Sequence, residues 1–182
     1  MESKDAFIKQ LKIETIEQAM DYYDEYGWCL IPVYPKSKLP VVKWGQYQIE
    51  RPDREITMDF FKGGIRNIAV VVGAVSNGLT CRDFDTRWEY RQWREAHPEW
   101  AKTLPTVRTS RGYHVYFRSD AQGCKTIRNG ELRGSGCICL LPNSIHKSGV
   151  RYEWFIRPNG EIPVVDDYQT VCAIQEVSHE EE

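Results

Sequence analysis

Hydrophobic positions follow two spacings in the first half of the chain. Residues 14–26 carry apolar side chains at helical spacing and are followed by Gly27, which predicts a helix with a glycine cap. Residues 28–34 form an apolar run typical of a strand, and Pro32 within it indicates an edge position or a bulge. The same spacings predict a short helix over 53–62 and strands over 67–75 and 79–85.

Short apolar runs dominate the second half. Residues 86–102 predict an amphipathic helix that is interrupted near Pro98. Because helices come early and strands late, we expect an α+β fold with a mixed or largely antiparallel sheet. We also expect one domain over residues 1–160 and an acidic segment over 161–182 whose end is disordered. Further strands are expected within residues 106–119, 124–133, 136–142 and 150–156.

Composition narrows the class of protein. The chain has 182 residues, of which 41% are hydrophobic and 27% are charged, as in a globular domain. No apolar run approaches the ~20 residues that a membrane helix needs, and the first residues do not resemble a signal peptide. Six cysteines without a CxxC pair are typical of a reduced chain, so we expect a cytoplasmic protein without a disulfide framework.

Charge is distributed unevenly along the chain. The net charge is −2, but residues 161–182 hold seven acids and no Lys or Arg, which leaves residues 1–160 at +5. Residues 108–133 hold six bases against two acids. A basic centre of this kind is typical of proteins that bind phosphate-bearing ligands, although solvated strand faces would give the same pattern.

The first candidate for chemistry is the pair Asp83 and Asp85. Side chains alternate along a strand, so the two carboxylates point to the same side while Phe84 points into the core. Two carboxylates at this spacing repel each other unless a cation lies between them, and phosphoryl-transfer sites bind divalent metal in this way. The alternative is a pair of solvated residues at the end of a strand.

A second candidate is the segment from Ser110 to His114. Ser110, Arg111 and Gly112 offer a hydroxyl, a guanidinium and a bend that exposes backbone N–H groups. His114 adds an imidazole donor at the start of an apolar strand. Together they suit phosphate oxygens, whereas a structural histidine is the alternative for His114 alone.

The third candidate lies near the end of the basic centre. Glu131 and Arg133 share one strand face, which suits a metal ligand beside a phosphate contact and equally suits a surface ion pair. Ser144 and His146 follow the next apolar run at its polar end.

The order of these motifs resembles the primase–polymerase (Prim-Pol) domain of the archaeo-eukaryotic primase superfamily, of the bifunctional DNA primase/polymerase N-terminal type. The resemblance covers roughly residues 16–156. It implies a two-lobed catalytic core over residues 1–160, with a mixed or antiparallel, RRM-like sheet flanked by helices. The motifs are Lys38-x-Pro40 with Trp44, Asp83-x-Asp85, Thr109-Ser110-x-Gly112-x-His114, Glu131-x-Arg133-Gly134 and Pro142-x-Ser144-x-His146.

The resemblance also implies a role for each motif. Asp83, Asp85 and Glu131 would hold two divalent ions, Mg²⁺ or Mn²⁺, and would form the catalytic set together with His114. The family usually has Asp at the third carboxylate position, where this chain has Glu131, one methylene longer, which bears on the metal spacing. Nucleotide contacts are expected from Lys38, Ser110, Arg111, Gly112, His114, Arg133, Ser144 and His146.

The activity implied is template-dependent nucleotidyl transfer, as DNA polymerase, primase or both, in the replication of a plasmid, phage or other mobile element. Extension of an existing primer is expected more than priming from nucleotides alone. The partners implied are a DNA template and primer, dNTPs or NTPs, and a replicative helicase encoded separately or on a longer parent chain. No membrane partner is expected.

Other functions share parts of the pattern. A catalytically inactive, primase-derived domain that binds nucleic acid or nucleotide would keep the fold, although all three carboxylate positions are acidic. A rolling-circle nickase needs a His-hydrophobic-His pair, whereas the strand reads His114-Val115-Tyr116. A nucleotide-sugar transferase also uses a DxD pair, but nothing indicates its larger fold. A zinc site would draw on Cys124, Cys137, Cys139 and His146, although two of these cysteines lie in an apolar strand.

Overall fold

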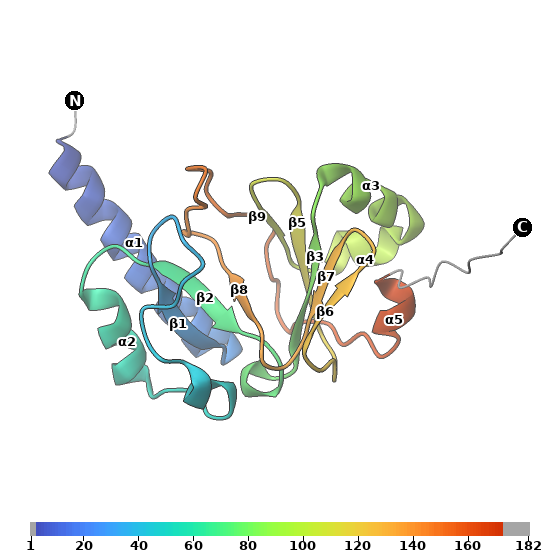
Figure 1. Ribbon diagram of the computed structural model, residues 1–182, viewed down its shortest axis with the longest axis horizontal. Helices are drawn as coiled ribbons and strands as arrows, with labels where there is room; N and C mark the ends of the chain where they lie inside the picture. The colour runs from blue at the N-terminus through green and yellow to red at the C-terminus, as the bar shows by residue number, and fades with distance from the viewer. Residues whose placement is uncertain (1–2, 173–182) are drawn as a thin grey trace, which may run out of the picture.

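The computed structural model describes residues 3–172 and has two sheets side by side, with helices on the outside of both (Figure 1). The first sheet has three strands in the order β1-β2-β8, and the second has six in the order β6-β7-β3-β5-β4-β9. All strand pairs within the two sheets are antiparallel. The α+β fold and the largely antiparallel sheet predicted from the sequence are therefore confirmed.

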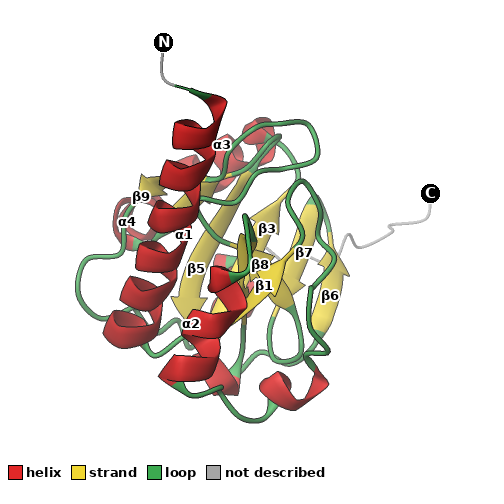
Figure 2. Cartoon of the chain, turned by 90° about the vertical axis from the view of Figure 1, so that its left-hand side faces the viewer, coloured by secondary structure: helices red, strands yellow, loops and turns green. Residues whose placement is uncertain are grey.

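The first lobe is built around the three-stranded sheet. β1 lies at the edge of this sheet, where Pro32 removes no hydrogen bond from a central ladder. Figure 2 shows α1 and α2 in front of the strands of this lobe. The elements of the lobe are α1 (Lys4–Tyr26), β1 (Cys29–Val33), η1 (Gly45–Gln48), α2 (Arg54–Lys62), β2 (Asn67–Val71), η2 (Ala74–Ser76) and β8 (Ile138–Leu140).

The first helix is longer than the sequence pattern predicted. It begins at Lys4 rather than at residue 14, because the Ser3 hydroxyl caps it by accepting a hydrogen bond from the Ala6 N–H. The added turns expose Phe7, Ile8 and Ile13 and bury Leu11, so their apolar positions give no regular core-facing pattern in the sequence. The helix ends at Gly27 in the left-handed conformation, as predicted.

The second lobe is built around the six-stranded sheet. β3 is central and is hydrogen-bonded to β5 on one side and to β7 on the other. Residues 124–133, predicted as one strand, form a hairpin that turns at Arg128 and Asn129, where Asn129 has a φ of 65°. The strands are β3 (Leu79–Phe84), β4 (Thr106–Arg108), β5 (Tyr113–Arg118), β6 (Cys124–Ile127), β7 (Gly130–Arg133) and β9 (Glu153–Ile156).

The two faces of the six-stranded sheet have different partners. One face packs against the first lobe, in a shared core that includes Trp28, Cys81 and Tyr116. The other face carries Phe84 and is covered by α3 (Arg87–Ala96), α4 (Pro98–Thr103) and α5 (Tyr168–Val171). α3 and α4 meet at His97, so the predicted interruption near Pro98 is confirmed. The face toward the first lobe is the one on which Asp83 lies.

The cysteines differ in one respect from the expectation of a fully reduced chain. Cys124 and Cys137 form a disulfide, with Cα atoms 5.9 Å apart, because the β6–β7 hairpin folds back beside the segment that leads into β8. That expectation is wrong for this pair. Four other cysteines are free and buried: Cys29, Cys81, Cys139 and Cys172.

The chain continues past residue 160 along the second lobe. Ile162 and Val165 are buried, and the backbone of Val165 bonds to that of Arg118 beside β5. The predicted disorder falls on residues 173–182, which lie outside the described residues. Among the residues that the structure describes, no helix is both long enough and apolar enough to cross a membrane.

Candidate active site

Three of the predicted residues lie opposite one another on neighbouring strands. Asp83 on β3 pairs in register with His114 on β5 and with Glu131 on β7. Directly opposite residues of antiparallel strands point to the same face of a sheet. The Nε2 atom of His114, which is buried, lies 3.5 Å from a carboxylate oxygen of Asp83. The cross-strand register therefore gathers the three side chains on the face that turns toward the first lobe.

Asp85 lies just beyond the end of β3 and is exposed. It borders a small cavity of about 70 Å³ together with Asp83 and His114. The loops that complete this cavity follow β1, join β4 to β5, and follow β8, and all three lie on the upper side of Figure 1. The predicted residues that these loops contribute are Lys38, Ser110, Arg111 and His146.

Two glycines explain how the neighbouring segments come so close to the end of β3. A Cβ atom at Gly112 would overlap the carbonyl oxygen of Phe84, and one at Gly130 would overlap the carbonyl oxygen of Asp83. Gly130 also has a φ of 139°, which L side chains rarely adopt. Gly112 thus acts by allowing close backbone packing, and this packing places Ser110 and Arg111 beside the carboxylates.

Arg133 links two of the predicted metal ligands. Its guanidinium donates to Asp83 and to Glu131, each at 2.8 Å, and to the carbonyl of Ile138 at 3.2 Å. Burial alone would raise the pKa of Asp83, but the nearby His114, Arg133 and Lys38 outweigh it and hold this pKa well below its usual range. Asp83 is therefore ionised at neutral pH.

The chemistry of the carboxylates fits a divalent cation. Carboxylate oxygens are the ligands that Mg²⁺ and Mn²⁺ prefer, and Asp83 and Asp85 present them to one cavity. Glu131 is held by Arg133 and does not border this cavity. Within residues 3–172 no three His, Cys, Asp or Glu side chains form a cluster that could hold a metal ion. Glu131 as a further ligand stays a prediction.

A second, larger cavity adjoins the first and is strongly basic. It has a volume of about 660 Å³ and shares Lys38, Ser110, Arg111 and His146 with the small cavity. No acidic side chain of the described chain lines it. We call it the basic basin, and its residues are Lys36, Ser37, Lys38, Ser110, Arg111, Leu140, His146, Lys147 and Ser148.

Several residues of this region were not predicted from the sequence. Lys36, Lys147 and Ser148 line the basic basin, and Tyr152 lines the small cavity. The signal available in the sequence was the pairing of basic residues in each loop, Lys36 with Lys38 and His146 with Lys147. What the sequence does not show is that the two loops meet.

The imidazole of His146 has a defined orientation. Its Nδ1 atom accepts a hydrogen bond from the Ser148 backbone N–H at 3.1 Å and lies 2.8 Å from the Ser148 hydroxyl. Burial and the positive charges of Lys38, Lys147 and Arg111 lower the pKa of His146. The neutral ring then carries its proton on Nε2, so His146 can donate a hydrogen bond to an anion.

Two predicted nucleotide contacts have other partners in the structure. Ser144 is fully buried, and its hydroxyl both accepts from the Ile68 N–H and donates to the Ile68 carbonyl. It fixes the loop after β8 to β2 and cannot reach a ligand in the cavity, which corrects the prediction. Arg133 directs its guanidinium at Asp83 and Glu131, so in this structure it positions carboxylates.

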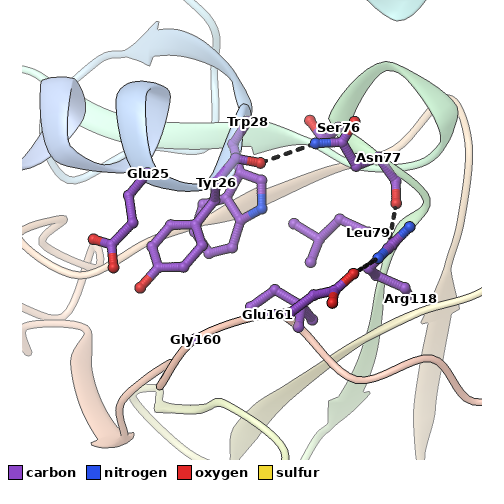
Figure 3. A pocket seen from close by; sticks show the side chains of 10 residues that line it. Glu25, Tyr26, Trp28, Ser76, Asn77, Leu79, Arg118, Gly160 and Glu161 are labelled. Atoms are coloured by element: carbon purple, nitrogen blue, oxygen red, sulfur yellow. Dashed lines mark hydrogen bonds and ion pairs between the residues drawn. The ribbon is translucent and has the colours of Figure 1, made fainter.

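Another cavity, of about 490 Å³, lies at the opposite end of β3 and β5 from the carboxylates (Figure 3). Asn77 donates to the Tyr26 carbonyl and accepts from Arg118, which in turn pairs with Glu161 at 2.7 Å. The polar groups of this cavity are bonded to one another, so fewer of them are free to bind a ligand than in the basic basin.

Comparison with known families adds an independent finding. The model of the Prim-Pol family, described as the bifunctional DNA primase/polymerase N-terminal domain, matches residues 19–165. This range contains every motif that bears on the two cavities. A comparison with curated proteins gives no match.

Proposed function

Because the chain belongs to the Prim-Pol family of bifunctional DNA primase/polymerase N-terminal domains, we propose that its two adjoining cavities form one site for template-dependent nucleotidyl transfer. The observation that carries the proposal is the meeting of an acidic pair, Asp83 and Asp85, with the acid-free basic basin. Transfer of a nucleotide needs both: a place for cations at the reacting phosphate and a place for the leaving polyphosphate.

The carboxylates would hold Mg²⁺ or Mn²⁺. Asp83 and Asp85 are the ligands that the cavity supports best, and Glu131, which lies opposite Asp83 on β7, would be a third once released from Arg133. When bound, the ions would neutralise charge on the phosphate oxygens and lower the pKa of the attacking 3′-hydroxyl. That hydroxyl would lose its proton to solvent and displace pyrophosphate from the α-phosphate of the incoming nucleotide.

The basic basin would bind the triphosphate. Lys38 and Arg111 border both cavities, so they suit the phosphates nearest the carboxylates. Lys36 and Lys147 border only the basin, which suits the terminal phosphates. The Nε2–H of His146 adds a neutral donor to these charged ones. Orientation of this kind contributes to catalysis by holding the α-phosphate in line for attack.

His114 and Arg133 would position the carboxylates. Both contact Asp83, and Arg133 contacts Glu131 as well. These contacts link β3, β5 and β7 at the site. We also propose that the site works on a DNA template and primer with dNTPs or NTPs, in mobile-element replication and beside a helicase.

Primer extension tests the proposal. Asp83→Asn and Asp85→Asn should each reduce extension of a primed template, with MgCl₂ or MnCl₂, by about two orders of magnitude or more. Asp59→Asn is the matched control, since Asp59 is an exposed carboxylate on α2 that pairs with Lys62. The proposal fails if both cavity variants extend primers as the wild type does.

One observation favours a second candidate, a domain that binds nucleotides without turnover. Arg133 already neutralises Asp83 and Glu131, as a structural ion-pair network would. Nucleotide binding by a wild-type chain that extends no primer under any divalent cation would support this candidate. The nickase alternative, which would need a tyrosine nucleophile, has less support. Tyr152 borders the cavity, but burial and the charge of Asp83 raise its pKa to about 12, so its hydroxyl is a poor nucleophile at neutral pH.

A further inference from the structure

The helical face of the second sheet has a cavity of its own. It measures about 850 Å³ and lies between α3, the β6–β7 hairpin and α5, at the right-hand side of Figure 1. Its floor is the face of β3 opposite to Asp83, where Arg82 and Phe84 point. We call it the helical-face groove. It is lined by Arg82, Phe84, Trp88, Glu89, Gln92, Trp93, Ala96, His97, Arg128, Asn129, Gln169, Thr170 and Cys172.

A buried cation lies at the floor of the groove, and within residues 3–172 it has no carboxylate partner. Arg82 is 4% exposed, and among these residues its guanidinium donates to backbone carbonyls alone, those of Asp83, Arg128 and Asn129. Its Nε–H has no hydrogen-bond partner within the described residues. A buried positive charge that is only partly satisfied favours an anion nearby.

The charge of the groove lining is positive. Among the described residues that line it, Glu89 is the one acid, and its carboxylate is already engaged by the backbone N–H and the hydroxyl of Thr86. Arg128 lies exposed on the hairpin turn above Arg82. The groove therefore offers an anionic ligand the exposed guanidinium of Arg128, the buried positive charge of Arg82 and little repulsion.

Aromatic side chains lie beside the positive charges in the helical-face groove. Trp88, on the first turn of α3, is 62% exposed, which is unusual for a tryptophan. Phe84, on the floor of the groove, packs against Trp93 with ring centroids 5.5 Å apart, and both rings are buried. Side-chain amides of Gln92 and Asn129 add donors and acceptors. Aromatic faces beside cations are the features that bind bases and phosphates of single-stranded nucleic acid.

The groove and the candidate active site lie on opposite faces of the second sheet and come together at the end of β3. Phe84 borders both cavities, and α3 begins directly after Asp85 and Thr86. A strand that leaves the carboxylates would pass over this end of the sheet and reach Trp88 on the first turn of α3. We propose that the helical-face groove binds single-stranded DNA, namely the unpaired part of the template strand. The identity of that strand rests on the proposed function, whereas binding itself does not.

Binding of a labelled oligonucleotide tests the inference. Fluorescence anisotropy of a 20-nucleotide single-stranded DNA with the full chain should show about tenfold weaker binding for Trp88→Ala and for Arg128→Ala. Trp88→Phe should restore much of the affinity. Ile49→Ala and Arg54→Ala are matched controls, because Ile49 is 87% exposed and Arg54 lies on α2 of the other lobe. Circular dichroism confirms that each variant is folded.

The outcomes separate the inference from the proposed function. Unchanged affinity in both groove variants would overturn the inference, as would full competition by free dATP, which would make the ligand a mononucleotide. Asp83→Asn should lose extension yet keep oligonucleotide affinity. If the wild type extends no primer but Trp88→Ala still weakens DNA binding, the proposed function is wrong, whereas the inference that the helical-face groove binds single-stranded DNA is supported.

Discussion

Asp83 has three basic side chains around it, those of His114, Arg133 and Lys38. Its carboxylate is 14% exposed, so these charges act through little water. The same contacts that would position a metal ligand also hold the centre of the sheet together, since β3, β5 and β7 meet there. Stability and the chemistry of the site are therefore linked at this residue.

The lowered pKa of Asp83 gives the fold a pH dependence. An unfolded Asp has a pKa of about 3.9, so ionised Asp83 stabilises the fold above that pH and loses this effect as the pH falls toward its folded value. Asp83→Asn should lower the free energy of unfolding by about 1–3 kcal/mol at pH 7. The difference in unfolding free energy between the wild type and Asp83→Asn should become smaller below pH ~4. Urea unfolding at several pH values measures this difference.

A gap between wild type and Asp83→Asn that stays constant from neutral to acid pH would contradict this prediction. Asp59→Asn again serves as the control, because its exposed pair with Lys62 contributes little.

Elements rather than single residues bring the site together. The β4–β5 loop carries Ser110 and Arg111, and it reaches the end of β3 only because Gly112 has no side chain. The β6–β7 hairpin places Glu131 beside Asp83 in the same way, through Gly130. Close backbone packing at two glycines thus determines the geometry of the carboxylates and their neighbours.

Gly112→Ala should therefore be costly. Its Cβ would overlap the backbone of Phe84, so we expect a loss of about 1–3 kcal/mol in the free energy of unfolding, from chemical denaturation, and weaker nucleotide binding. Gly45→Ala is the control, since a Cβ there meets nothing within 4 Å. Equal stability of the two variants would show that the loop has another conformation.

Strand alternation in the sequence predicted that Asp83 and Asp85 point to one side, and in the structure both border one cavity. It could not give the register that sets Asp83 between His114 and Glu131, because pairing depends on residues far apart in the chain. Residues 124–133 read as one strand, since Arg128 and Asn129 interrupt the run only weakly. The sequence also could not show that Ser144 is buried, because its hydroxyl bonds to Ile68 on β2, which lies far away in the chain.

At the scale of the whole molecule, the site lies where the two lobes meet. The carboxylates belong to the second sheet, whereas Lys36 and Lys38 come from the loop after β1 of the first lobe. The basic basin is invisible in the sequence for this reason: its cations come from three separate loops, and the net charge of −2 conceals them. The domain class, by contrast, followed from the motifs and their order.

The central claim assigns different tasks to the two cavities, and single-turnover incorporation of one nucleotide tests it most directly. Asp85→Asn should slow the maximal rate by about two orders of magnitude while the apparent nucleotide affinity changes little. Lys147→Ala should weaken nucleotide affinity about tenfold and leave the maximal rate largely intact. Lys102→Ala, an exposed lysine paired with Glu99 on α4, should change neither. A maximal rate that survives in Asp85→Asn, or nucleotide affinity that survives in Lys147→Ala, would contradict the account.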